Sequence, residues 1–326
     1  MIITRSPLRI TLGGGGTDLP SYYRRRGGFL IAGAIDKYVY VTVMRPFVEG
    51  IFLKYSRLEH VATVGEVQHP ILREAIRLLD FRTPQIEITT LADIPAGTGL
   101  GSSGSFTTAL LKALHAHRRR PLLADALAAM ACELEMNTLA EPIGKQDQYA
   151  AAYGGVTCFT FNPDDTVFAT PLKANREALS NLEENLLLFF TKFSRTAGSI
   201  LKDQKDRSDQ AEPAMLHNLD YVKDLGYRCQ EALEGGRTAA FGELMHEHWE
   251  HKKKRSIRMS NPQIDAWYQI ARDNGAIGGK LVGAGGGGFL LFYSEEHRRL
   301  RSAMAEAGLE ELRFSFDYEG TKALLG

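Results

Sequence analysis

Hydrophobic and polar positions in the first half of the chain follow two periods, one typical of strands and one typical of helices. β-Branched and aromatic residues predict strands at 38–44 (YVYVTVM) and 85–90 (QIEITT). A helix is predicted at about 104–117, after a loop rich in glycine and serine. A second helix, from 122 to about 139, is predicted because five apolar residues share one helical face: Leu123, Leu127, Met130, Ala131 and Leu134.

A β-hairpin and a change in composition come next. The segments 156–161 (VTCFTF) and 166–172 (TVFATPL) flank the sequence NPDD, a pattern typical of a hairpin. Residues from about 174 to 184 are polar, and we interpret them as a linker. The sequence therefore predicts a domain boundary here, with domains at 1–173 and 174–326.

The second half of the chain is predicted to form an α+β layer in the order strand, helices, strand, strand, helix, strand. The predicted elements are a buried strand at 185–193, two or three helices within about 196–273, two strands around a glycine loop at 276–294, a helix at 294–307 and a strand at 312–318.

Composition restricts the classes of function. The 326 residues suffice for two domains or one large α/β domain, and 44% hydrophobic and 24% charged residues are ordinary for a soluble globular protein. Lys and Arg number 39, as do Asp and Glu, and a net charge of zero disfavours nucleic acid as a partner. We interpret three local basic runs as solvated faces: 24–26, 118–120 and 252–255.

Cysteine spacing and the lack of long apolar segments predict a cytoplasmic protein with no membrane partner. Cys132, Cys158 and Cys229 are far apart and odd in number, so neither a zinc site nor a disulfide framework is expected. The N-terminus has no apolar core after a basic start, so no signal peptide is expected. The longest apolar runs, such as 186–190, are too short to span a membrane.

The segment HEHWEH raises the question of a metal site. It contains His246, His248 and His251, but no ligand geometry follows from the sequence. We interpret this segment as a solvated helix face, since Mg²⁺ does not prefer imidazole ligands.

Three glycine-rich loops are the main candidates for chemistry: 13–16, 95–105 and 283–288. The second and third each fit the dinucleotide pattern G-x-G-x-x-G, but the predicted elements around them do not fit that fold. Pro95 interrupts the approach to the second loop, and the helix after the loop is followed by another helix. The second loop is not a Walker A loop either, because no Gly-Lys-Ser/Thr closes its glycine run.

The second loop nevertheless has the features of an anion site. Glycine lets backbone N–H groups approach a phosphate, and the helix after the loop directs its free N–H groups toward it. Ser102 and Ser103 supply hydroxyls for a phosphate oxygen or for Mg²⁺, which takes one or two protein oxygens in such sites. A carboxylate is therefore expected nearby, and periodicity does not choose among the candidates: Glu133, Glu135, Glu141 and Asp147.

Asp147 differs from the other carboxylates in its surroundings. It lies between two glutamines in GKQDQ and is followed by the small, apolar segment YAAAYGG. An acid in that setting suits a general base, or a group that orients a hydroxyl.

These segments, in this order, resemble the GHMP small-molecule kinases. The family's N-terminal motif is similar to SPLRITLGGGGTDLP, its phosphate loop P-x-x-x-G-L-G-S-S matches 95–103 at every fixed position, and its C-terminal motif is similar to KLVGAGGGGFLLF at 280–292. The resemblance covers nearly the whole chain. It implies a two-domain α+β GHMP kinase fold, with an N-terminal ATP-binding α/β domain and a C-terminal ferredoxin-like α/β domain.

The resemblance also implies cofactors and catalytic roles. ATP is implied as the phosphoryl donor and Mg²⁺ as its cofactor, with Ser103 and Glu135 as the metal ligands. Asp147 is implied to orient or deprotonate the attacking hydroxyl, and Arg9 to keep Asp147 ionised and stabilise developing charge. The residues implied to bind the nucleotide phosphates are Pro95, Gly97, Gly99, Leu100, Gly101, Ser102, Ser103, Gly104 and Ser105.

Within the family, the GGGTD form of the first motif and GKQDQYAAAYGG most resemble the D-glycero-D-manno-heptose 7-phosphate 1-kinases, which implies a step toward nucleotide-activated heptose and surface polysaccharide. Galactokinases carry a Glu-His pair where this chain has Gly15 and Gly16, which disfavours galactose. Arg195 is our first candidate for binding a 7-phosphate, ahead of Lys202 and the lysines at 252–254. The residues implied to contact the sugar are Gly14, Gly15, Gly16, Thr17, Asp18, Arg195, Gly285 and Gly286.

The expected partners are therefore ATP and a small sugar phosphate, with a homodimer as a candidate assembly. Three alternatives stay open. The first is a GHMP kinase for another sugar, of the mannose, fucose or galactose type. The second is the decarboxylase branch of the family, which the sugar-like GGGTD disfavours. The third is a non-catalytic ligand-binding relative, which the presence of Asp147, Glu135 and Ser103 disfavours.

Overall fold

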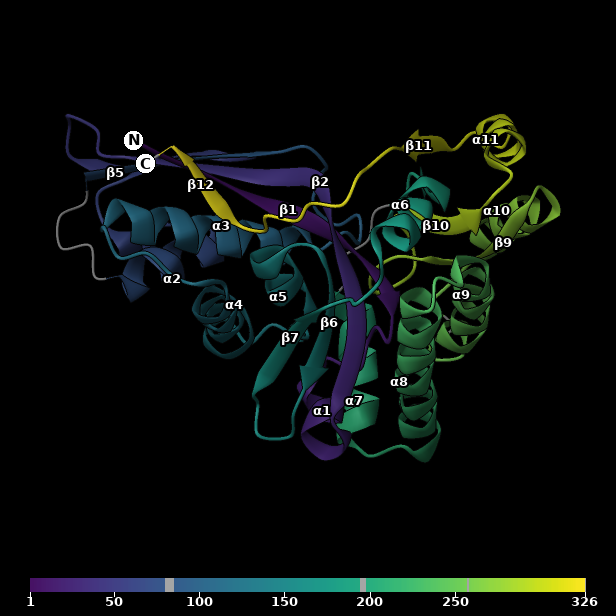
Figure 1. Cartoon of the computed structure of the whole chain (residues 1–326). Coiled ribbons are helices and arrows are strands. Elements are labelled where there is room, and N and C mark those ends of the chain that lie inside the picture. Colours follow the sequence, from purple (N-terminus) through teal and green to yellow (C-terminus); the bar gives the residue numbers. More distant parts are fainter. Residues whose placement is uncertain (80–84, 194–197, 257, 326) are drawn as a thin grey trace.

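The chain folds around two β-sheets that lie beside one another, each with helices packed against it (Figure 1). The computed structural model describes residues 1–79, 85–193, 198–256 and 258–325. Within these residues, one sheet has eight strands and comes from the N-terminal half and the C-terminus, while the other has four strands from the second half.

The larger sheet has the strand order β12-β1-β2-β5-β3-β4, and β6 and β7 continue it from the first part of β2. The predicted hairpin is confirmed as β6 and β7, and the predicted strand at 38–44 is the last part of a longer strand. The strands of this sheet are β1 (Ile2–Gly13), β2 (Gly28–Met44), β3 (Gly50–Lys54), β4 (Leu58–Val61), β5 (Gln85–Ala92), β6 (Val156–Phe161), β7 (Val167–Pro171) and β12 (Lys322–Leu325).

Strand β1 carries the first site residues. Pro7 cannot donate a ladder hydrogen bond, and the register between β1 and β2 shifts between Pro7 and Leu8. Beyond this irregularity, Leu8 and Leu12 are fully buried in the core. Because side chains alternate along a strand, Arg9 and Thr11 point to the opposite face, where they line a cavity.

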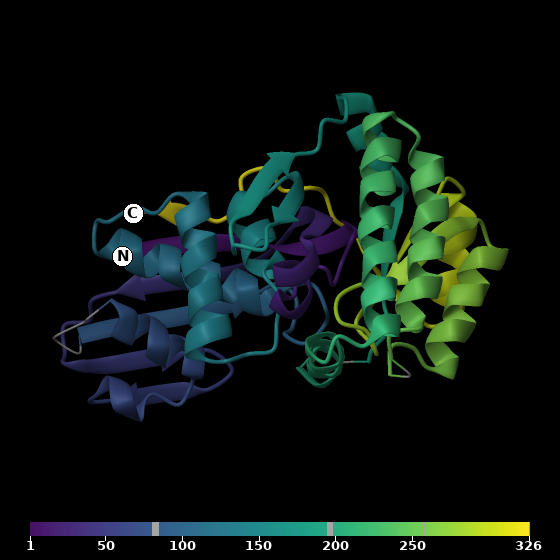
Figure 2. The same ribbon diagram turned by 90° about the horizontal axis from the view of Figure 1, so that it is seen from below.

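Helices α3 (Ser102–His117) and α5 (Gln146–Tyr153) pack directly on β1 and β2. Helices α2 (Pro70–Leu78) and α4 (Ala124–Cys132) pack against α3, and the one-turn η1 (Val64–Glu66) precedes α2. Figure 2 shows these helices as a layer beside the larger sheet. The apolar faces of α3 and α4 share one core with the strands, which fixes the start of α3 relative to β1.

The predicted helix at 122–139 changes character in its second half. It is α-helical as α4, and then continues as a π-helical segment, η2 (Glu133–Thr138). π-Helical turns widen the helix and are frequent at functional sites. Here the segment carries Glu135, whose side chain is almost completely buried.

The second sheet confirms the ferredoxin-like prediction. Its order is β11-β8-β10-β9 with antiparallel neighbours throughout, so the four strands lie in the order fourth, first, third, second. Its elements are β8 (Leu186–Phe190), β9 (Ala276–Leu281), β10 (Phe289–Ser294), α11 (His297–Glu306) and β11 (Glu310–Leu312).

Four described helices connect β8 to β9, where the sequence predicted two or three: α7 (Gly198–Asp209), α8 (Pro213–Glu234), α9 (Thr238–Lys253) and α10 (Pro262–Asp273). Helix α8 contacts β1 and β2 as well as α9, and α9 contacts β9. One core combines residues of β1, α8, β8 and β10. The two sheets are therefore joined by buried apolar contacts, and the site between them is held from both sides.

The predicted strand at 312–318 is wrong for most of its length. β11 ends at Leu312, and Phe316 makes only an isolated bridge with Ile35. The chain then returns to the larger sheet, where β12 pairs with β1, so the N- and C-termini lie close together (Figure 1). The apolar residues of 312–318 alternate with polar ones, as in a strand. In the structure, however, they cover the junction between the two sheets. The boundary at 173/174 stays a prediction, and the last residues of the chain pair with the first strand.

The predicted linker at 174–184 is also wrong, because helix α6 (Arg176–Asn185) occupies it. Asn175 is its N-cap, and its side-chain Oδ1 accepts a hydrogen bond of 2.7 Å from the N–H of Ala178. Ala178 and Leu182 are buried and anchor this otherwise polar helix. The helix was missed because only two of its apolar residues lie on the buried face, and the many charged residues around them resemble a linker.

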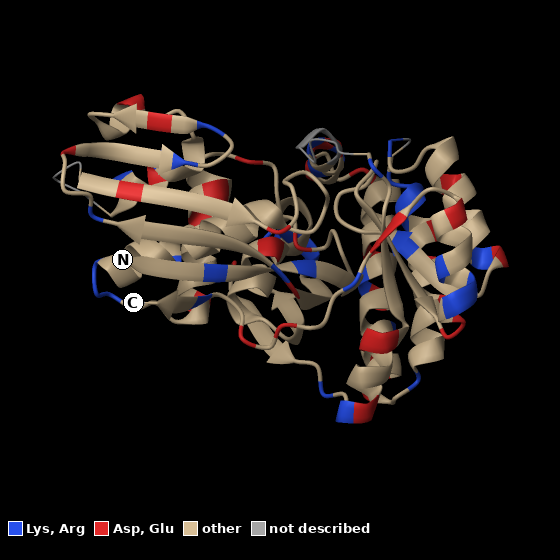
Figure 3. Ribbon diagram, turned by 90° about the horizontal axis from the view of Figure 1, so that it is seen from above, with Lys and Arg blue, Asp and Glu red and all other residues tan. Residues whose placement is uncertain are grey.

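Charged residues of both signs are interspersed over both halves of the structure (Figure 3). Arg24 and Arg26 form exposed ion pairs with Asp165 and Asp220, as expected for a solvated run. The run 252–255 is different, because two of its side chains are buried. None of the described helices combines the length and apolar character needed to cross a lipid bilayer.

The N-cap of α6 gives a stability prediction. Asn175→Ala should lower the free energy of unfolding by about 1 kcal/mol, because the N–H of Ala178 loses its acceptor. Asn175→Asp, which keeps the acceptor, should stay close to wild type. Urea unfolding followed by circular dichroism measures both. Equal stability of Asn175→Ala and wild type would show that the cap contributes nothing to α6.

Candidate active site

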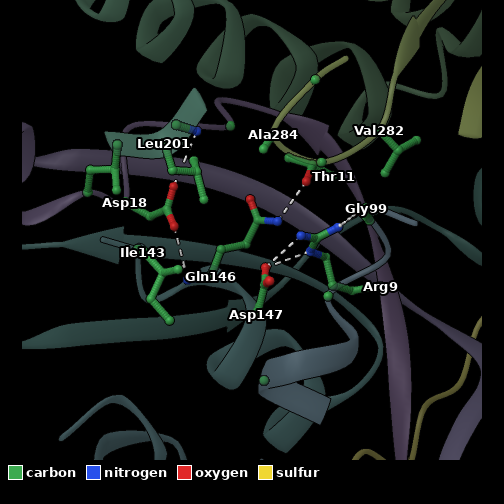
Figure 4. Close-up of a pocket in the computed structure, with 18 of the residues that line it drawn as sticks. Arg9, Thr11, Asp18, Gly99, Ile143, Gln146, Asp147, Leu201, Val282 and Ala284 are labelled. Carbon is green, nitrogen blue, oxygen red and sulfur yellow. Dashed lines mark hydrogen bonds and ion pairs between the residues drawn. The ribbon is translucent and has the colours of Figure 1, made fainter. Parts of the chain in front are cut away.

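A single cavity between the two sheets gathers residues from all three glycine-rich loops. Its lining comes from β1 and the loop after it, the start of α3, η2, α5, α7, the end of α9 and the loop between β9 and β10. Figure 4 shows Arg9, Asp147, Gln146 and Asp18 pointing into this cavity. The side chains that the sequence placed in separate motifs therefore meet in one place.

The start of α3 presents free backbone donors to the cavity. Gly101, the N-cap residue, adopts a left-handed conformation with φ of 78°, and none of the described side chains caps this helix end. Gly101, Ser102, Ser103 and Gly104 all line the cavity. The N–H groups at a helix start have no intrahelical acceptor, and the helix dipole adds positive charge there. This end of the cavity is suited to bind phosphate oxygens.

Gly104 allows α3 to approach α5 closely. A Cβ atom at position 104 would lie 2.7 Å from Cβ of Asp147 and 2.9 Å from the backbone N of Gln148. Such distances are not tolerated between non-bonded atoms, so only glycine fits here. This contact places Asp147 directly beside the first turn of α3.

Arg9 fixes the orientation of Asp147. Its Nε and Nη2 atoms lie 2.8 Å and 2.7 Å from Oδ1 of Asp147, and its Nη1 donates to the carbonyl of Gly99 at 2.7 Å. Arg9 is buried, whereas the Asp147 side chain is 31% exposed. Because both contacts use Oδ1, the second carboxylate oxygen is left for a ligand in the cavity. The ion pair also keeps positive charge next to the reacting position.

Glu135 is a buried carboxylate with two neutral partners. Its Oε2 accepts a hydrogen bond of 2.6 Å from the Ser103 hydroxyl, and its Oε1 accepts one of 2.9 Å from the amide of Gln148. Burial raises the pKa of Glu135, and the hydrogen bonds from Ser103 and Gln148 act in the opposite direction. No described cation forms an ion pair with it, although it lines the cavity. A hydroxyl and a buried, uncompensated carboxylate side by side form a donor set that suits a hard cation such as Mg²⁺.

Asp18 lies on the glycine-run side of the cavity, where two backbone groups hold it. Its Oδ1 accepts from the N–H of Gly16 at 3.2 Å, and its Oδ2 accepts from the N–H of Gln146 at 3.1 Å. Burial raises the pKa of Asp18, the hydrogen bond from Gln146 lowers it, and the nearby charge of Asp147 raises it again. Because these two N–H groups leave further lone pairs free, Asp18 can accept hydrogen bonds from sugar hydroxyls.

The third glycine loop closes the cavity against the second. A Cβ atom at Gly283 would lie 2.6 Å from the Cα of Gly99, and one at Gly99 would lie 2.8 Å from the carbonyl oxygen of Val282. Both glycines have positive φ values. The two loops therefore touch through their backbones, and larger side chains would separate the two halves of the site.

Four buried basic side chains line the cavity near this third loop, and we call them the basic cluster: His248, Lys252, Arg255 and Lys280. Their exposed fractions lie between 2% and 7%. Burial lowers the pKa of Lys280 to about 7 and that of Arg255 to about 10. Burial also lowers the pKa of Lys252, and repulsion from Arg255 and Lys280 adds to that effect.

The predictions for the segments 246–251 and 252–255 therefore need correction. His248 is buried and lies beside the Nζ of Lys280 at 3.2 Å, so it is not on a solvated face. Lys252 and Arg255 are buried as well, because the end of α9 packs onto the glycine loops. His248, Lys252 and Arg255 recur at spacings of four and three residues, a signal for a shared helical face that the sequence already contained.

Most of the phosphate-loop residues predicted from the sequence line the cavity, but some support it from behind. Leu100 and Ser105 are fully buried, and the Ser105 hydroxyl donates to the carbonyl of Pro7 at 2.7 Å. Pro95 is not among the lining residues. The predicted phosphate-loop residues in the lining are Gly97, Gly99, Gly101, Ser102, Ser103 and Gly104.

The predicted sugar-binding residues divide in the same way. Gly15, Gly16, Asp18 and Gly285 line the cavity. The Thr17 hydroxyl, however, is buried and donates to the carbonyls of Gly14 and Phe29, so it holds the loop together rather than facing a ligand. Gly14 packs against the backbone of Phe29, and Gly286 is not part of the lining. Arg195 lies outside the described residues, and Lys202 is exposed away from the cavity.

Several lining residues were missed by the sequence reasoning. Gln146 donates from its side-chain amide to the Thr11 hydroxyl at 2.7 Å and so joins α5 to β1 (Figure 4). Strand alternation from Arg9 would have indicated Thr11. Lys280 was part of the third motif but had no assigned role. Gln204 of α7, which donates to the carbonyl of Gly16 at 3.1 Å, had no assigned role.

Comparison with known families agrees with this geometry. Residues 70–155 match the N-terminal domain of the GHMP kinases, and residues 229–309 match the C-terminal domain of the same family. Together the two matches span about half of the chain. The chain therefore belongs to the GHMP kinase family, as its motifs predicted, and it is an ATP-dependent phosphotransferase.

Two heptose phosphate kinases and a galactokinase are similar to this chain. A D-glycero-α-D-manno-heptose 7-phosphate kinase of Campylobacter jejuni is 28% identical over 99% of this chain and 98% of its own length. The crystal structure of a D-glycero-D-manno-heptose 1-phosphate kinase from Bacteroides thetaiotaomicron has a TM-score of 0.80 at 26% identity, covering 100% of this chain and 99% of that one. A Lactococcus lactis galactokinase complexed with galactose has a TM-score of 0.77 at 16% identity, which supports the fold alone.

The buried position of Lys280 predicts that the protein becomes more stable from about pH 7 to about pH 8. The folded pKa is about 7, whereas an unfolded lysine titrates near 10.4, so the unfolded chain binds more protons in this window and stability rises with pH. Around Lys280, His248 is neutral because burial lowers its pKa, and Arg255 stays charged. Burial raises the pKa of Cys229 to about 12, which has the opposite effect only at higher pH.

Chemical unfolding at the two ends of this window measures the effect. Lys280→Met should reduce the increase, with a remainder from Lys252, whose pKa burial also lowers. Lys54→Met, at an exposed position on β3, should keep the full increase. If Lys280→Met showed the same pH dependence as wild type, Lys280 would be charged throughout and the assigned burial effect would be wrong.

Proposed function

We propose that this GHMP kinase transfers the γ-phosphoryl group of ATP to the anomeric hydroxyl of D-glycero-D-manno-heptose 7-phosphate, a step toward nucleotide-activated heptose. The observation that carries the proposal is the Arg9–Asp147 pair beside the uncapped start of α3, with Asp18 on the other side of Asp147. This arrangement offers a phosphate site, then a proton acceptor, and then a hydroxyl-binding carboxylate, in that spatial order along one cavity.

Asp147 is proposed to receive or orient the proton of the attacking hydroxyl. In the reaction, the sugar oxygen forms a bond to Pγ, the bond between Pγ and the β,γ-bridging oxygen breaks, and ADP leaves. Arg9 holds Oδ1 of Asp147, so the other carboxylate oxygen can face the hydroxyl. The Arg9 guanidinium and the N–H groups of α3 stabilise the charge that develops on the phosphoryl oxygens.

Ser103 and Glu135 are the residues that fit Mg²⁺. When bound, the metal would neutralise charge on the β- and γ-phosphates of the nucleotide. No group of three or more His, Cys, Asp or Glu side chains in the described parts of the chain is arranged to hold a metal by itself. This agrees with a metal that completes its coordination with phosphate oxygens and water.

The choice of a heptose rests on the glycine run and on the relatives. Gly15 and Gly16 line the cavity where a larger side chain would occupy the space of the sugar. The full-length relative from C. jejuni is named as a heptose 7-phosphate kinase. A bifunctional L-fucokinase of Bacteroides fragilis is also similar, at 27% identity over 93% of this chain, but the match covers only 36% of that protein.

Product analysis tests the proposed reaction. Purified protein with Mg²⁺, ATP and heptose 7-phosphate should give a 1,7-bisphosphate, and its new ³¹P resonance should couple to the anomeric proton. Fucose, mannose and galactose should be much poorer acceptors in the same assay. Turnover of one of these sugars with none of heptose 7-phosphate would contradict the proposal.

The proposed role of Asp147 gives a kinetic prediction. Asp147→Asn should lower kcat by about 10²- to 10⁴-fold, the usual contribution of a positioned acid or base, with little change in the KM for ATP. Asp224→Asn, on the exposed face of α8, is the matched control and should behave like wild type. Turnover by Asp147→Asn at the wild-type rate would remove Asp147 from the chemistry.

The proposed metal site gives a binding prediction. Glu135→Gln should weaken the Mg²⁺-dependent part of the affinity for a non-hydrolysable ATP analogue by about tenfold or more, because a charged ligand is replaced by a neutral one. Calorimetric titration with and without Mg²⁺ separates this effect from turnover. Because burial raises the pKa of Glu135, the wild-type Mg²⁺ effect should also weaken as the pH falls. An unchanged Mg²⁺ effect in Glu135→Gln would place the metal elsewhere.

A further inference from the structure

The basic cluster has no carboxylate partner among the described residues, although its members are buried. The ammonium group of Lys252 donates to the backbone carbonyls of Leu281 and Gly283, at 2.8 Å and 2.5 Å. That of Lys280 donates to the carbonyl of Leu12 at 2.7 Å. Among the described residues, none of the acidic side chains lies within ion-pair distance of Lys252, Arg255 or Lys280. Buried cations are normally paired, so this cluster is costly unless an anion completes it.

Two donors of the basic cluster are buried and have no acceptor in the part of the chain that the structure describes. Arg255 uses Nε for the side chain of Asn218 and Nη1 for the carbonyl of Gly15, both at 3.0 Å, and leaves Nη2 without a partner. His248 has Nδ1 at 3.2 Å from Nζ of Lys280; while Lys280 is protonated this group can only donate, so the ring proton of His248 resides on Nε2. That Nε2–H is also unpartnered. Arg255 and His248 both line the cavity.

The basic cluster extends along the cavity wall from the third glycine loop, where Lys252 bonds to Gly283 beside the phosphate loop, to the glycine run, where Arg255 lies. Arg255 bonds to the glycine run at Gly15, and the charge of Asp18 acts on Arg255. Asp18 is in turn joined through the backbone of Gln146 to the segment that carries Asp147. The order along the cavity is thus α3, Asp147, Asp18 and then Arg255. An acceptor whose reacting hydroxyl is at Asp147 would extend past Asp18 toward Arg255.

We infer that Lys252, Arg255 and Lys280, with His248 as a neutral donor, form a subsite that binds the phosphate of the acceptor. This inference rests on the proposed function for the location of the reacting hydroxyl. It replaces Arg195 as the first candidate for this role and keeps Lys252 from the weaker candidates at 202 and 252–254. A phosphate dianion supplies acceptor oxygens for Nη2 of Arg255 and Nε2 of His248, and its charge offsets the repulsion among the cations. The acceptor class is a phosphorylated sugar, with its phosphate at the end opposite to the reacting hydroxyl.

The kinetic test compares heptose 7-phosphate with the same heptose lacking the phosphate. Wild type should prefer the phosphorylated sugar by about 10³-fold or more in kcat/KM, because removal of that group leaves buried donors unpaired. Arg255→Met and Lys252→Met should each reduce this preference by about 10- to 100-fold. The kcat/KM for the unphosphorylated heptose should fall much less than that for heptose 7-phosphate. Arg237→Met is the control, because Arg237 is exposed at the start of α9. This variant should keep the full preference.

A binding measurement on the wild-type protein does not depend on the identity of the sugar. With Mg²⁺ and a non-hydrolysable ATP analogue saturating the nucleotide site, millimolar inorganic phosphate should raise the melting temperature. It should also compete with heptose 7-phosphate. The melting-temperature shift should be lost in Arg255→Met and kept in Arg237→Met.

The outcomes distinguish the subsite from the proposed function. If heptose 7-phosphate is not turned over but the phosphate effect requires Arg255, the subsite holds and the sugar is wrong. If heptose 7-phosphate is turned over and the variants lose activity equally with both heptoses, the cations have a structural role and the subsite is wrong. Absence of a phosphate effect on wild type, together with no preference for the phosphorylated sugar, would also overturn it.

Discussion

The contact between the first turn of α3 and the first turn of α5 is the constraint on which the site depends. Gly104 has no side chain, so the two helices approach too closely for any larger residue. This places Asp147 beside the uncapped helix start. Arg9, from the strand that both helices cover, then fixes one oxygen of Asp147. The proposed phosphate site and proton acceptor are thus held together by packing, since α3 and α5 both pack on β1.

The second sheet completes the site from the other side. Its glycine loop touches the phosphate loop backbone to backbone, and the end of α9 brings buried cations to the cavity wall. The core shared by β1, α8 and β10 keeps these parts in place. The fold therefore makes one cavity with donors for anions at two ends, and carboxylates between them. Such an arrangement suits a reaction in which both substrates carry phosphate.

The sequence predicted the fold class and many of the residues that line the cavity. The loop glycines and Asp147 stood out by composition and setting, whereas Arg9 was implied only by the resemblance to the GHMP kinases. Helix α6 and the C-terminal return were missed because tertiary contacts decide them: α6 buries only a few side chains, and the apolar residues at 312–318 cover a junction between sheets. Lys252 and Arg255 were interpreted as part of a solvated run, with Lys252 only a weaker candidate for the 7-phosphate, because lysine and arginine are usually exposed. Only the packing of α9 on the glycine loops reveals their burial. Likewise, Thr17 was assigned to the sugar, but its hydroxyl ties two backbone segments together.

The central claim is that one bound acceptor spans the cavity from Asp147 to Arg255 while the nucleotide phosphates lie at the start of α3. A crystal structure with Mg²⁺, a non-hydrolysable ATP analogue and heptose 7-phosphate tests it most directly. We predict that the anomeric oxygen lies within hydrogen-bond distance of Asp147, and that the 7-phosphate contacts Arg255 and His248. A sugar bound with its 7-phosphate at α3, or with its anomeric oxygen facing away from Asp147, would contradict this account.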